Sequence, residues 1–141
     1  MKLRAARLRD VARKAARDRD WPGATIAWRS YLARRPDDVG AWIQYGHAAK
    51  EAGDADGAIA AYSRALAAVP SDAETWWHLG GVYRRRGDRA AAIDCFARAA
   101  ALGPAGYRAA AELVEVGARD RLPGGAGGDE AARYQAFRRQ L

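Results

Sequence analysis

Two pairs of side chains have the spacing at which one helix face can offer two ligands to a metal ion. His47 precedes Glu51 by four residues, and Glu74 precedes His78 by the same step. Residues four apart are neighbours on a helix surface, and imidazole and carboxylate groups are both zinc ligands. A zinc site needs three or four ligands, however, and no third ligand is obvious beside either pair. Ordinary pairing on an exposed helix face is therefore favoured, and we expect no metal and no cofactor.

The other candidates for catalysis are also incomplete. Ser30, Ser63 and Ser71 have no histidine near them in the pattern, and a nucleophile triad would need one. The Gly-rich run at 124–128 lacks the following Lys and Ser or Thr of a phosphate-binding loop. The single Cys95 excludes an intramolecular disulfide and a cysteine zinc site, and we expect it to be packed in a helix rather than reactive. These features favour a protein that is not an enzyme and that resides in a reducing, cytoplasmic compartment.

Positive charge is concentrated at the start of the chain. The 141 residues carry 24 Lys and Arg against 17 Asp and Glu, which gives a net charge of +7. The first 20 residues alone hold eight Lys and Arg against three Asp. No run of 18 apolar residues occurs, so no membrane span is expected. Because the excess belongs to one segment, it indicates where an acidic partner would lie rather than a uniformly basic surface.

The elements that must position these residues follow from an internal repeat. Three prolines, Pro36, Pro70 and Pro104, stand 34 residues apart. The same step relates alanines, aromatic residues and glycines: Ala24, Ala58 and Ala92; Trp28, Tyr62 and Phe96; Trp42 and Trp76; Gly46 and Gly80. A period of this length that contains two helical patterns indicates a stacked array of helix-turn-helix units.

The repeated residues resemble those of the tetratricopeptide repeat family. The unit at 73–106 has the complete pattern, and the unit at 39–72 is similar, with Tyr45 in the place of Leu79 and Ala49 where the pattern has a tyrosine. The unit at 5–38 matches in its second helix. The complete pattern consists of Trp76, Leu79, Gly80, Tyr83, Ala92, Phe96 and Pro104. The resemblance implies an all-α fold, a helix-turn-helix solenoid of three 34-residue repeats with a C-terminal capping helix.

This resemblance also sets the expected domain organisation. Residues 1–121 would form the repeat domain, 122–128 a Gly-rich linker, and 129–141 a short amphipathic helix or tail. Helices are expected at 5–18, 21–34, 39–52, 55–68, 73–86 and 89–102, followed by a capping helix at 107–118. In this capping helix, Leu113 and Val114 would face the last repeat, and Glu112 and Glu115 would face outward.

Glycines mark the positions where helices meet or end. Gly46 and Gly80 lie in the middle of helices, where glycine costs about 1 kcal/mol relative to alanine. We expect that a neighbouring helix approaches closely at these positions, which would account for the use of glycine despite its cost. A larger side chain there would overpack the contact and cost about 1 to 3 kcal/mol. The Gly-Asp pairs at 53–54 and 87–88 are typical of a helix C-terminus followed by the N-cap of the next helix.

The family register places one set of side chains in the concave groove of the repeats. Trp77 would be the apolar anchor, which can contribute about 2 kcal/mol or more, while each exposed charge contributes about 0.2 to 1 kcal/mol. The arginines at 9, 13 and 17 step by four and form one stripe. The predicted groove consists of Arg9, Arg13, Arg17, Ile43, Gln44, His47, Lys50, Trp77, His78, Arg84 and Arg85.

The expected function is that of a non-catalytic scaffold that binds an acidic peptide segment of a partner protein in this groove. Two alternatives remain open. The sequence at 42–53 resembles repeat regions that precede bacterial glycosyltransferase domains, which implies a substrate-docking or regulatory module of a larger enzyme. Nucleic-acid binding through the basic first helix ranks lower, because that helix lacks interleaved exposed aromatics for base stacking. Self-association through the C-terminal segment or the repeat ends is a further open point.

Overall fold

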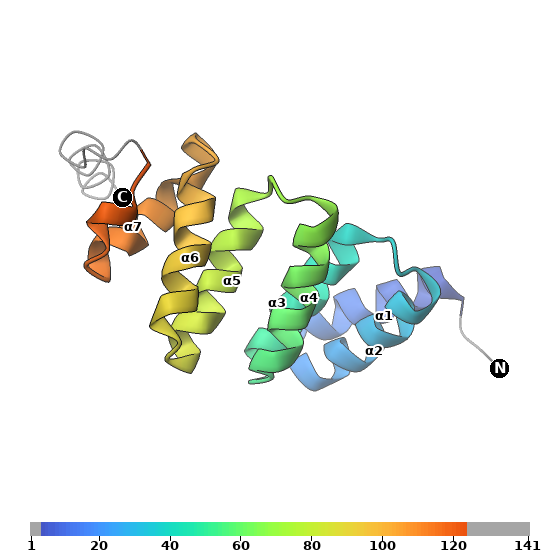
Figure 1. The fold of residues 1–141 in the computed structure, drawn as a ribbon. Helices are drawn as coiled ribbons and strands as arrows, with labels where there is room; N and C mark the ends of the chain where they lie inside the picture. The colour runs from blue at the N-terminus through green and yellow to red at the C-terminus, as the bar shows by residue number, and fades with distance from the viewer. Residues whose placement is uncertain (1–3, 124–141) are drawn as a thin grey trace. The chain divides into compact units, whose positions relative to one another are not determined.

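The computed structural model describes residues 4–123, and their regular secondary structure is entirely helical (Figure 1). The first six helices begin and end within two residues of the expected positions. The expected tail at 129–141 lies outside the described residues. The helices are α1 (Ala5–Arg17), α2 (Trp21–Arg34), α3 (Val39–Glu51), α4 (Ala55–Ala68), α5 (Ala73–Arg86), α6 (Arg89–Ala100) and α7 (Tyr107–Glu115), with short 3-10 turns at Pro104–Gly106 and Arg119–Arg121. None of the helices between residues 4 and 123 has the length and apolarity needed to cross a lipid bilayer.

The chain forms two compact units, Met1–Pro70 (unit 1) and Ser71–Leu141 (unit 2). In unit 1, α1 packs on α2, α2 on α3, and α3 on α4. In unit 2, α5 packs on α6, and α6 packs on α7. Each unit is thus built from helical hairpins, as the repeat predicts.

An aspartate begins each of the helices α2 to α6. Its carboxylate accepts a hydrogen bond from the backbone N–H three residues further on, which satisfies one of the free donors of the first turn. The five N-caps are Asp20, Asp38, Asp54, Asp72 and Asp88. Gly53 and Gly87 precede two of them with φ of 81° and 86°, a left-handed conformation that suits glycine. The Gly-Asp pairs are therefore confirmed as helix boundaries.

Two mid-helix glycines allow close contact with an aromatic ring of the following helix. A Cβ atom at Gly46 would lie 2.6 Å from Cε1 of Tyr62, and one at Gly80 would lie 2.5 Å from Cε1 of Phe96. Both rings are buried, Tyr62 completely. The expected reason for these glycines is confirmed, because no side chain fits between the two helices of either hairpin.

The core of unit 2 is completed by α7. Leu113 is fully buried beside Phe96, and Val114 packs against the same cluster. These contacts confirm the capping role of the helix. It ends at Glu115 rather than at 118, because Gly117 adopts a φ of 75° and takes the chain out of the helical conformation.

Candidate functional site

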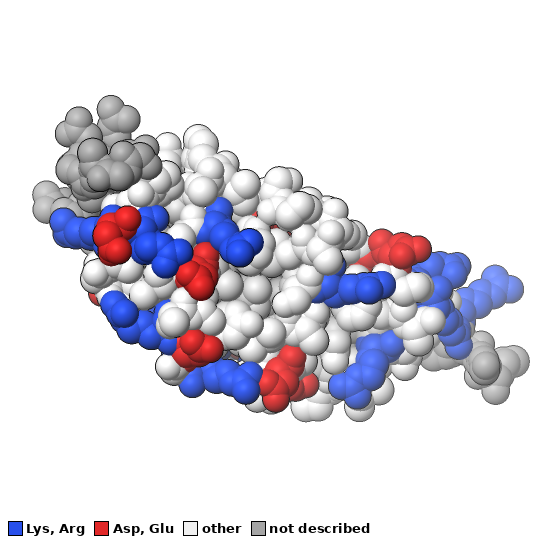
Figure 2. Space-filling view, in the orientation of Figure 1, with Lys and Arg blue, Asp and Glu red and all other residues white. Residues whose placement is uncertain are grey.

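The first candidate surface is the arginine stripe, defined as Arg9, Arg13 and Arg17 of α1. The helix buries Leu8 and Ala12 on its inner face and leaves Arg13 and Arg17 exposed. Arg9 is half-buried, and its Nε is enclosed without a hydrogen-bond partner. Among residues 4–123, none of the three guanidinium groups forms a hydrogen bond or an ion pair with a carboxylate. Figure 2 shows Lys and Arg side chains gathered over the N-terminal helices.

Two arginines of the stripe, Arg9 and Arg13, act on the charge of Asp38, the N-cap of α3. Tyr31 donates a hydrogen bond to Oδ2 of Asp38 at 2.6 Å, and the N–H of Ala41 donates to Oδ1 at 3.1 Å. These hydrogen bonds, followed by the positive charges of Arg9 and Arg13, hold the pKa of Asp38 below its ordinary value. The bond to Asp38 also raises the pKa of Tyr31. Asp38 therefore remains ionised at neutral pH. Its carboxylate is attracted by the arginines of α1 while it caps the first turn of α3.

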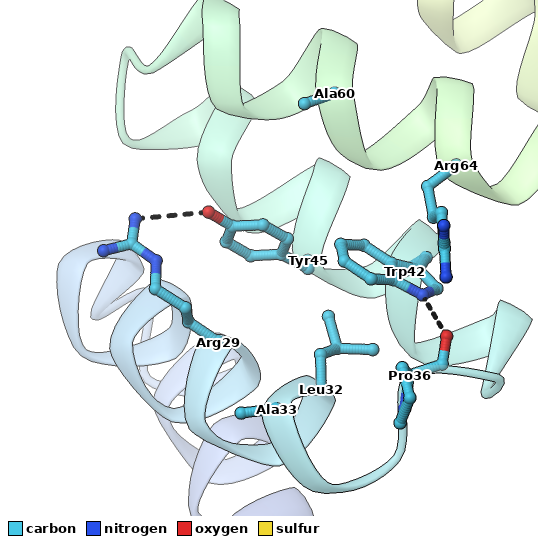
Figure 3. A pocket seen from close by; sticks show the side chains of 8 residues that line it. All are labelled: Arg29, Leu32, Ala33, Pro36, Trp42, Tyr45, Ala60 and Arg64. Carbon is cyan, nitrogen blue, oxygen red and sulfur yellow. Dashed lines mark hydrogen bonds between the residues drawn. The ribbon is translucent and has the colours of Figure 1, made fainter.

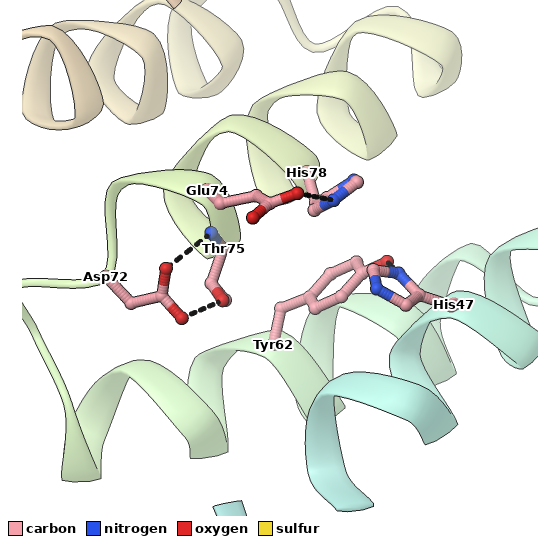
Figure 4. Close-up of polar contacts among 6 residues, drawn as sticks. All are labelled: His47, Tyr62, Asp72, Glu74, Thr75 and His78. Atoms are coloured by element: carbon pink, nitrogen blue, oxygen red, sulfur yellow. Dashed lines mark hydrogen bonds and ion pairs between the residues drawn. The ribbon is translucent and has the colours of Figure 1, made fainter. Parts of the chain in front are cut away.

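The predicted groove positions on α3 have different environments. Gln44 is exposed, while Ile43, His47 and Lys50 are half-buried. Nδ1 of His47 lies 2.5 Å from the hydroxyl of Tyr62, and Figure 4 shows the imidazole beside the phenol. Burial, followed by the negative charge of Glu51, raises the pKa of Tyr62, so the phenol keeps its proton and can donate it to His47. His47 is therefore held by a buried tyrosine that the sequence did not link to it.

Trp77 in unit 2 is partly a core residue. Its side chain is half-buried and packs against the hydrophobic cluster around Phe96 and Leu113. The guanidinium of Arg108 lies 5.2 Å from the centre of the indole, and the ring of His78 lies 4.8 Å from it. The indole is thus covered in part by Arg108 of α7, a contact that the repeat register did not indicate.

The cations of unit 2 have local acceptors that the sequence did not reveal. Arg84 forms an ion pair with Glu112, which therefore does not simply face outward as expected. Arg121 contacts Asp94 at 2.9 Å, whereas Arg85 is exposed. Two arginines of unit 2, Arg84 and Arg121, are thus paired with carboxylates of the same unit, in contrast to the arginine stripe of unit 1.

Glu74 and His78 form the side-chain pair on one helix face that their four-residue spacing predicts. Nε2 of His78 lies 3.7 Å from Oε1 of Glu74 (Figure 4). Among the described residues, no group of three His, Cys, Asp or Glu side chains converges as a metal site would require. Cys95 is buried, which raises the pKa of its thiol to about 11 and makes the reactive thiolate scarce at neutral pH.

Unit 1 contains a pocket that the sequence did not predict (Figure 3). It has a volume of about 640 Å³ and lies between α2, α3 and α4. Nε1 of Trp42 donates to the carbonyl of Pro36 at 2.7 Å, and Arg29 donates to the hydroxyl of Tyr45 at 3.2 Å. The guanidinium of Arg64 lies 5.7 Å from the centre of the Trp42 ring. The lining residues are Arg29, Leu32, Ala33, Pro36, Trp42, Tyr45, Ala60 and Arg64.

Solved structures of other proteins have the same fold. MamA superimposes with a TM-score of 0.79 over 97% of this chain and 74% of its own, at 20% sequence identity. PcrH in complex with the chaperone binding region of PopB gives a TM-score of 0.68 over 79% of this chain and 92% of its own, at 18% identity. The TPR2B domain of yeast Sti1, from a complex with pHsp70, gives 0.63 over 97% and 98%, at 19% identity.

Sequence comparison identifies the repeat itself. No curated protein sequence gives a significant match. The family model for the tetratricopeptide repeat matches residues 9–73 and 44–107, which together span most of the chain. These segments contain most of the helical hairpins described above, so the all-helical repeat fold is confirmed by sequence and structure alike. The chain therefore belongs to the tetratricopeptide repeat family.

Proposed function

We propose that this chain is a protein-interaction module that binds an acidic peptide segment of a partner protein through unit 1. The observation that carries the proposal is the arginine stripe, in which three cations on one face of α1 form no ion pair with a carboxylate of the described residues. PcrH and the Sti1 domain are related in fold and were both crystallised or solved as complexes with protein segments, PopB and pHsp70 respectively. Those complexes support peptide binding as a use of this fold.

The repeat register extends the proposed surface onto α3. Arg9 and Ile43 are 34 residues apart, as are Arg13 and His47, so each pair holds one position on successive first helices. Ile43 would supply an apolar contact beside the stripe, and Lys50 a further positive charge. Gln44 is proposed as a further contact on α3. The four positions of unit 2, Trp77, His78, Arg84 and Arg85, are proposed as contacts of that unit by itself.

Binding of a labelled acidic peptide tests the proposal. The probe is a fluorescein-labelled peptide in which glutamate alternates with leucine, and its affinity is measured by fluorescence anisotropy at low and moderate salt. We expect Arg13→Gln/Arg17→Gln to weaken binding about 2- to 30-fold, since each exposed ion pair contributes about 0.2 to 1 kcal/mol. The affinity should also fall as salt screens the charges.

A matched variant separates the stripe from net charge. Arg4→Gln/Arg7→Gln removes the same charge from exposed positions on the same segment but outside the stripe. We expect it to change the affinity much less than the stripe variant. Equal losses from both double variants would contradict a localised site. Stronger binding of duplex DNA or RNA than of the peptide would instead favour the nucleic-acid alternative.

A further inference from the structure

The pocket of unit 1 lies on a different side of α3 from the predicted groove. At 3.6 residues per turn, Trp42 and Tyr45 occupy the face of α3 that is roughly opposite to Gln44 and His47. Its other walls come from α2 and α4. Figure 3 shows Arg29 and Arg64 on these two walls, with the rings of Trp42 and Tyr45 between them. An occupant of the pocket would therefore bind independently of a peptide on the arginine stripe.

Hydrogen-bond donors that still have protons to donate converge on this pocket. One N–H group of Arg29 is used by the hydroxyl of Tyr45, and among the described residues neither Arg29 nor Arg64 forms an ion pair with a carboxylate. The hydroxyl of Tyr45 accepts that bond, but no described residue accepts its own proton. The nearby carboxylate of Asp54 is engaged in capping α4. Two guanidinium groups and a phenol thus form a donor set suited to an anion.

The rest of the lining is apolar and partly open to solvent. Leu32 is buried at the side of the pocket, and the indole of Trp42 is half-buried. Ala33, Pro36 and Ala60 are exposed at its rim. The volume of about 640 Å³ accommodates a large side chain and falls within the range of ligand sites. Because the rim is exposed, an occupant would keep one side in solvent, as a surface-bound peptide does.

Comparison with the next repeat separates the framework of the pocket from its specific donors. Residues 34 positions further on repeat the framework, since Leu66, Pro70, Trp76 and Arg98 correspond to Leu32, Pro36, Trp42 and Arg64. Three other lining positions change. Arg29 corresponds to Ser63, Tyr45 to Leu79, and Ala60 to Asp94. The repeat fold therefore does not require Arg29 and Tyr45, nor does it require a small uncharged residue at position 60.

From these observations we infer that the pocket binds a partner peptide in which a carboxylate stands beside a large apolar side chain. The apolar side chain lies on Trp42 between Leu32 and Ala60. The carboxylate accepts hydrogen bonds from Arg29 and Tyr45 and faces the charge of Arg64. The site is additional to the arginine stripe, and it can fail or succeed separately from the proposed function.

Three labelled peptides that differ only in their last two residues or in the C-terminal group distinguish the possible sources of the carboxylate. The first ends in phenylalanine with a free carboxylate, the second ends in phenylalanine amide, and the third is the amide with glutamate before the phenylalanine. We expect the first, the third, or both to bind at least about tenfold more tightly than the plain amide, as a charged hydrogen bond would provide. Equal affinities for all three peptides, or no binding of any, would overturn the inference.

Single substitutions then locate the binding. Arg29→Ser and Ala60→Asp install the residues of the equivalent repeat positions, so both should fold normally, which thermal unfolding followed by circular dichroism checks. Ala60→Asp places a competing carboxylate between the donors, and each variant should weaken binding at least about tenfold. Ala6→Asp adds the same charge at an exposed alanine of α1 and should leave the affinity unchanged. If Ala60→Asp binds the peptides as the natural chain does, the pocket is not their site.

A spectroscopic signal reports on the pocket directly. The indole N–H of Trp42 gives one of five tryptophan side-chain signals in an ¹⁵N–¹H correlation spectrum, and Trp42→Phe assigns it. We expect the peptide that binds to shift this signal more than those of the other tryptophans. A peptide that binds without moving the Trp42 signal would place the site elsewhere.

Discussion

Adjacent glycines in α5 should respond to the same substitution with opposite signs. A Cβ at Gly80 would lie 2.5 Å from Cε1 and 2.7 Å from Cδ1 of Phe96, whereas a Cβ at Gly81 meets no atom within 4 Å. Alanine gains about 1 kcal/mol over glycine in a helix at either position. At Gly80 an overpacking cost of about 1 to 3 kcal/mol opposes this gain, because the Phe96 ring is almost completely buried and has little room to move.

We therefore expect Gly81→Ala to raise the free energy of unfolding by up to about 1 kcal/mol. Gly80→Ala should lower it by up to about 2 kcal/mol, so that the two variants differ by about 1 to 3 kcal/mol. Urea unfolding followed by circular dichroism measures both values. The gain in helix propensity is shared, so the difference reports the contact with Phe96 alone.

A third variant tests whether the aromatic ring is the cause. In Gly80→Ala/Phe96→Leu the smaller side chain relieves the close contact, so the two substitutions should be non-additive, with the double variant more stable than the sum of the single effects. The reasoning would be refuted if Gly80→Ala and Gly81→Ala shifted the urea midpoint equally and in the same direction. Additivity in the double variant would also show that the Phe96 ring is not what limits position 80.

Two further predictions concern acid stability and the role of Trp77. The pKa of Asp38 is lowered by folding, so its contribution to stability is complete above its ordinary value of about 3.8 and is lost as the pH falls through the folded-state value. Asp38→Asn keeps a side chain that can cap the helix but removes the charge. The variant and the natural chain should differ most in the free energy of unfolding at neutral pH, and the difference should shrink below about pH 4. Urea unfolding measured at a series of acidic pH values tests this expectation. A difference that stays constant with pH would contradict a role for the charge. Trp77→Ala should lower the free energy of unfolding by about 2 to 4 kcal/mol, because the indole packs against the core and beneath Arg108; an unchanged urea midpoint would show that this packing contributes little.

The local features of the fold could be predicted because the repeat expresses them within short stretches of sequence. Gly46 and Gly80 indicated close helix contacts, and the Gly-Asp pairs indicated helix boundaries, since each depends on the conformation of a few neighbouring residues. Leu113 was correctly assigned to the interface of the capping helix for the same reason, because apolar spacing identifies the buried face of a helix.

The candidate sites depend on pairs that periodicity does not encode. The ion pair of Arg84 with Glu112 and the position of Arg108 over Trp77 join helices that are separated by another helix in the sequence. Repeat register identifies the face on which a side chain lies, but it does not identify the residue that covers that face. The pocket was missed because its apolar members look like ordinary core positions. The departures of Arg29 and Tyr45 from the repeat were the signal that could have indicated it.

The contact between a glycine and an aromatic ring also distinguishes α7 from the first helices of the two preceding hairpins. Helix α7 continues the 34-residue register, and Val114 stands where Gly46 and Gly80 stand in α3 and α5. A valine side chain therefore stands at the register position where the two preceding hairpins have only a hydrogen atom facing Tyr62 or Phe96. A helix designed to pack on α7 as α4 packs on α3 would need a residue smaller than an aromatic opposite Val114, or glycine at position 114. Extending the array by copying one hairpin thus calls for a change at this position as well.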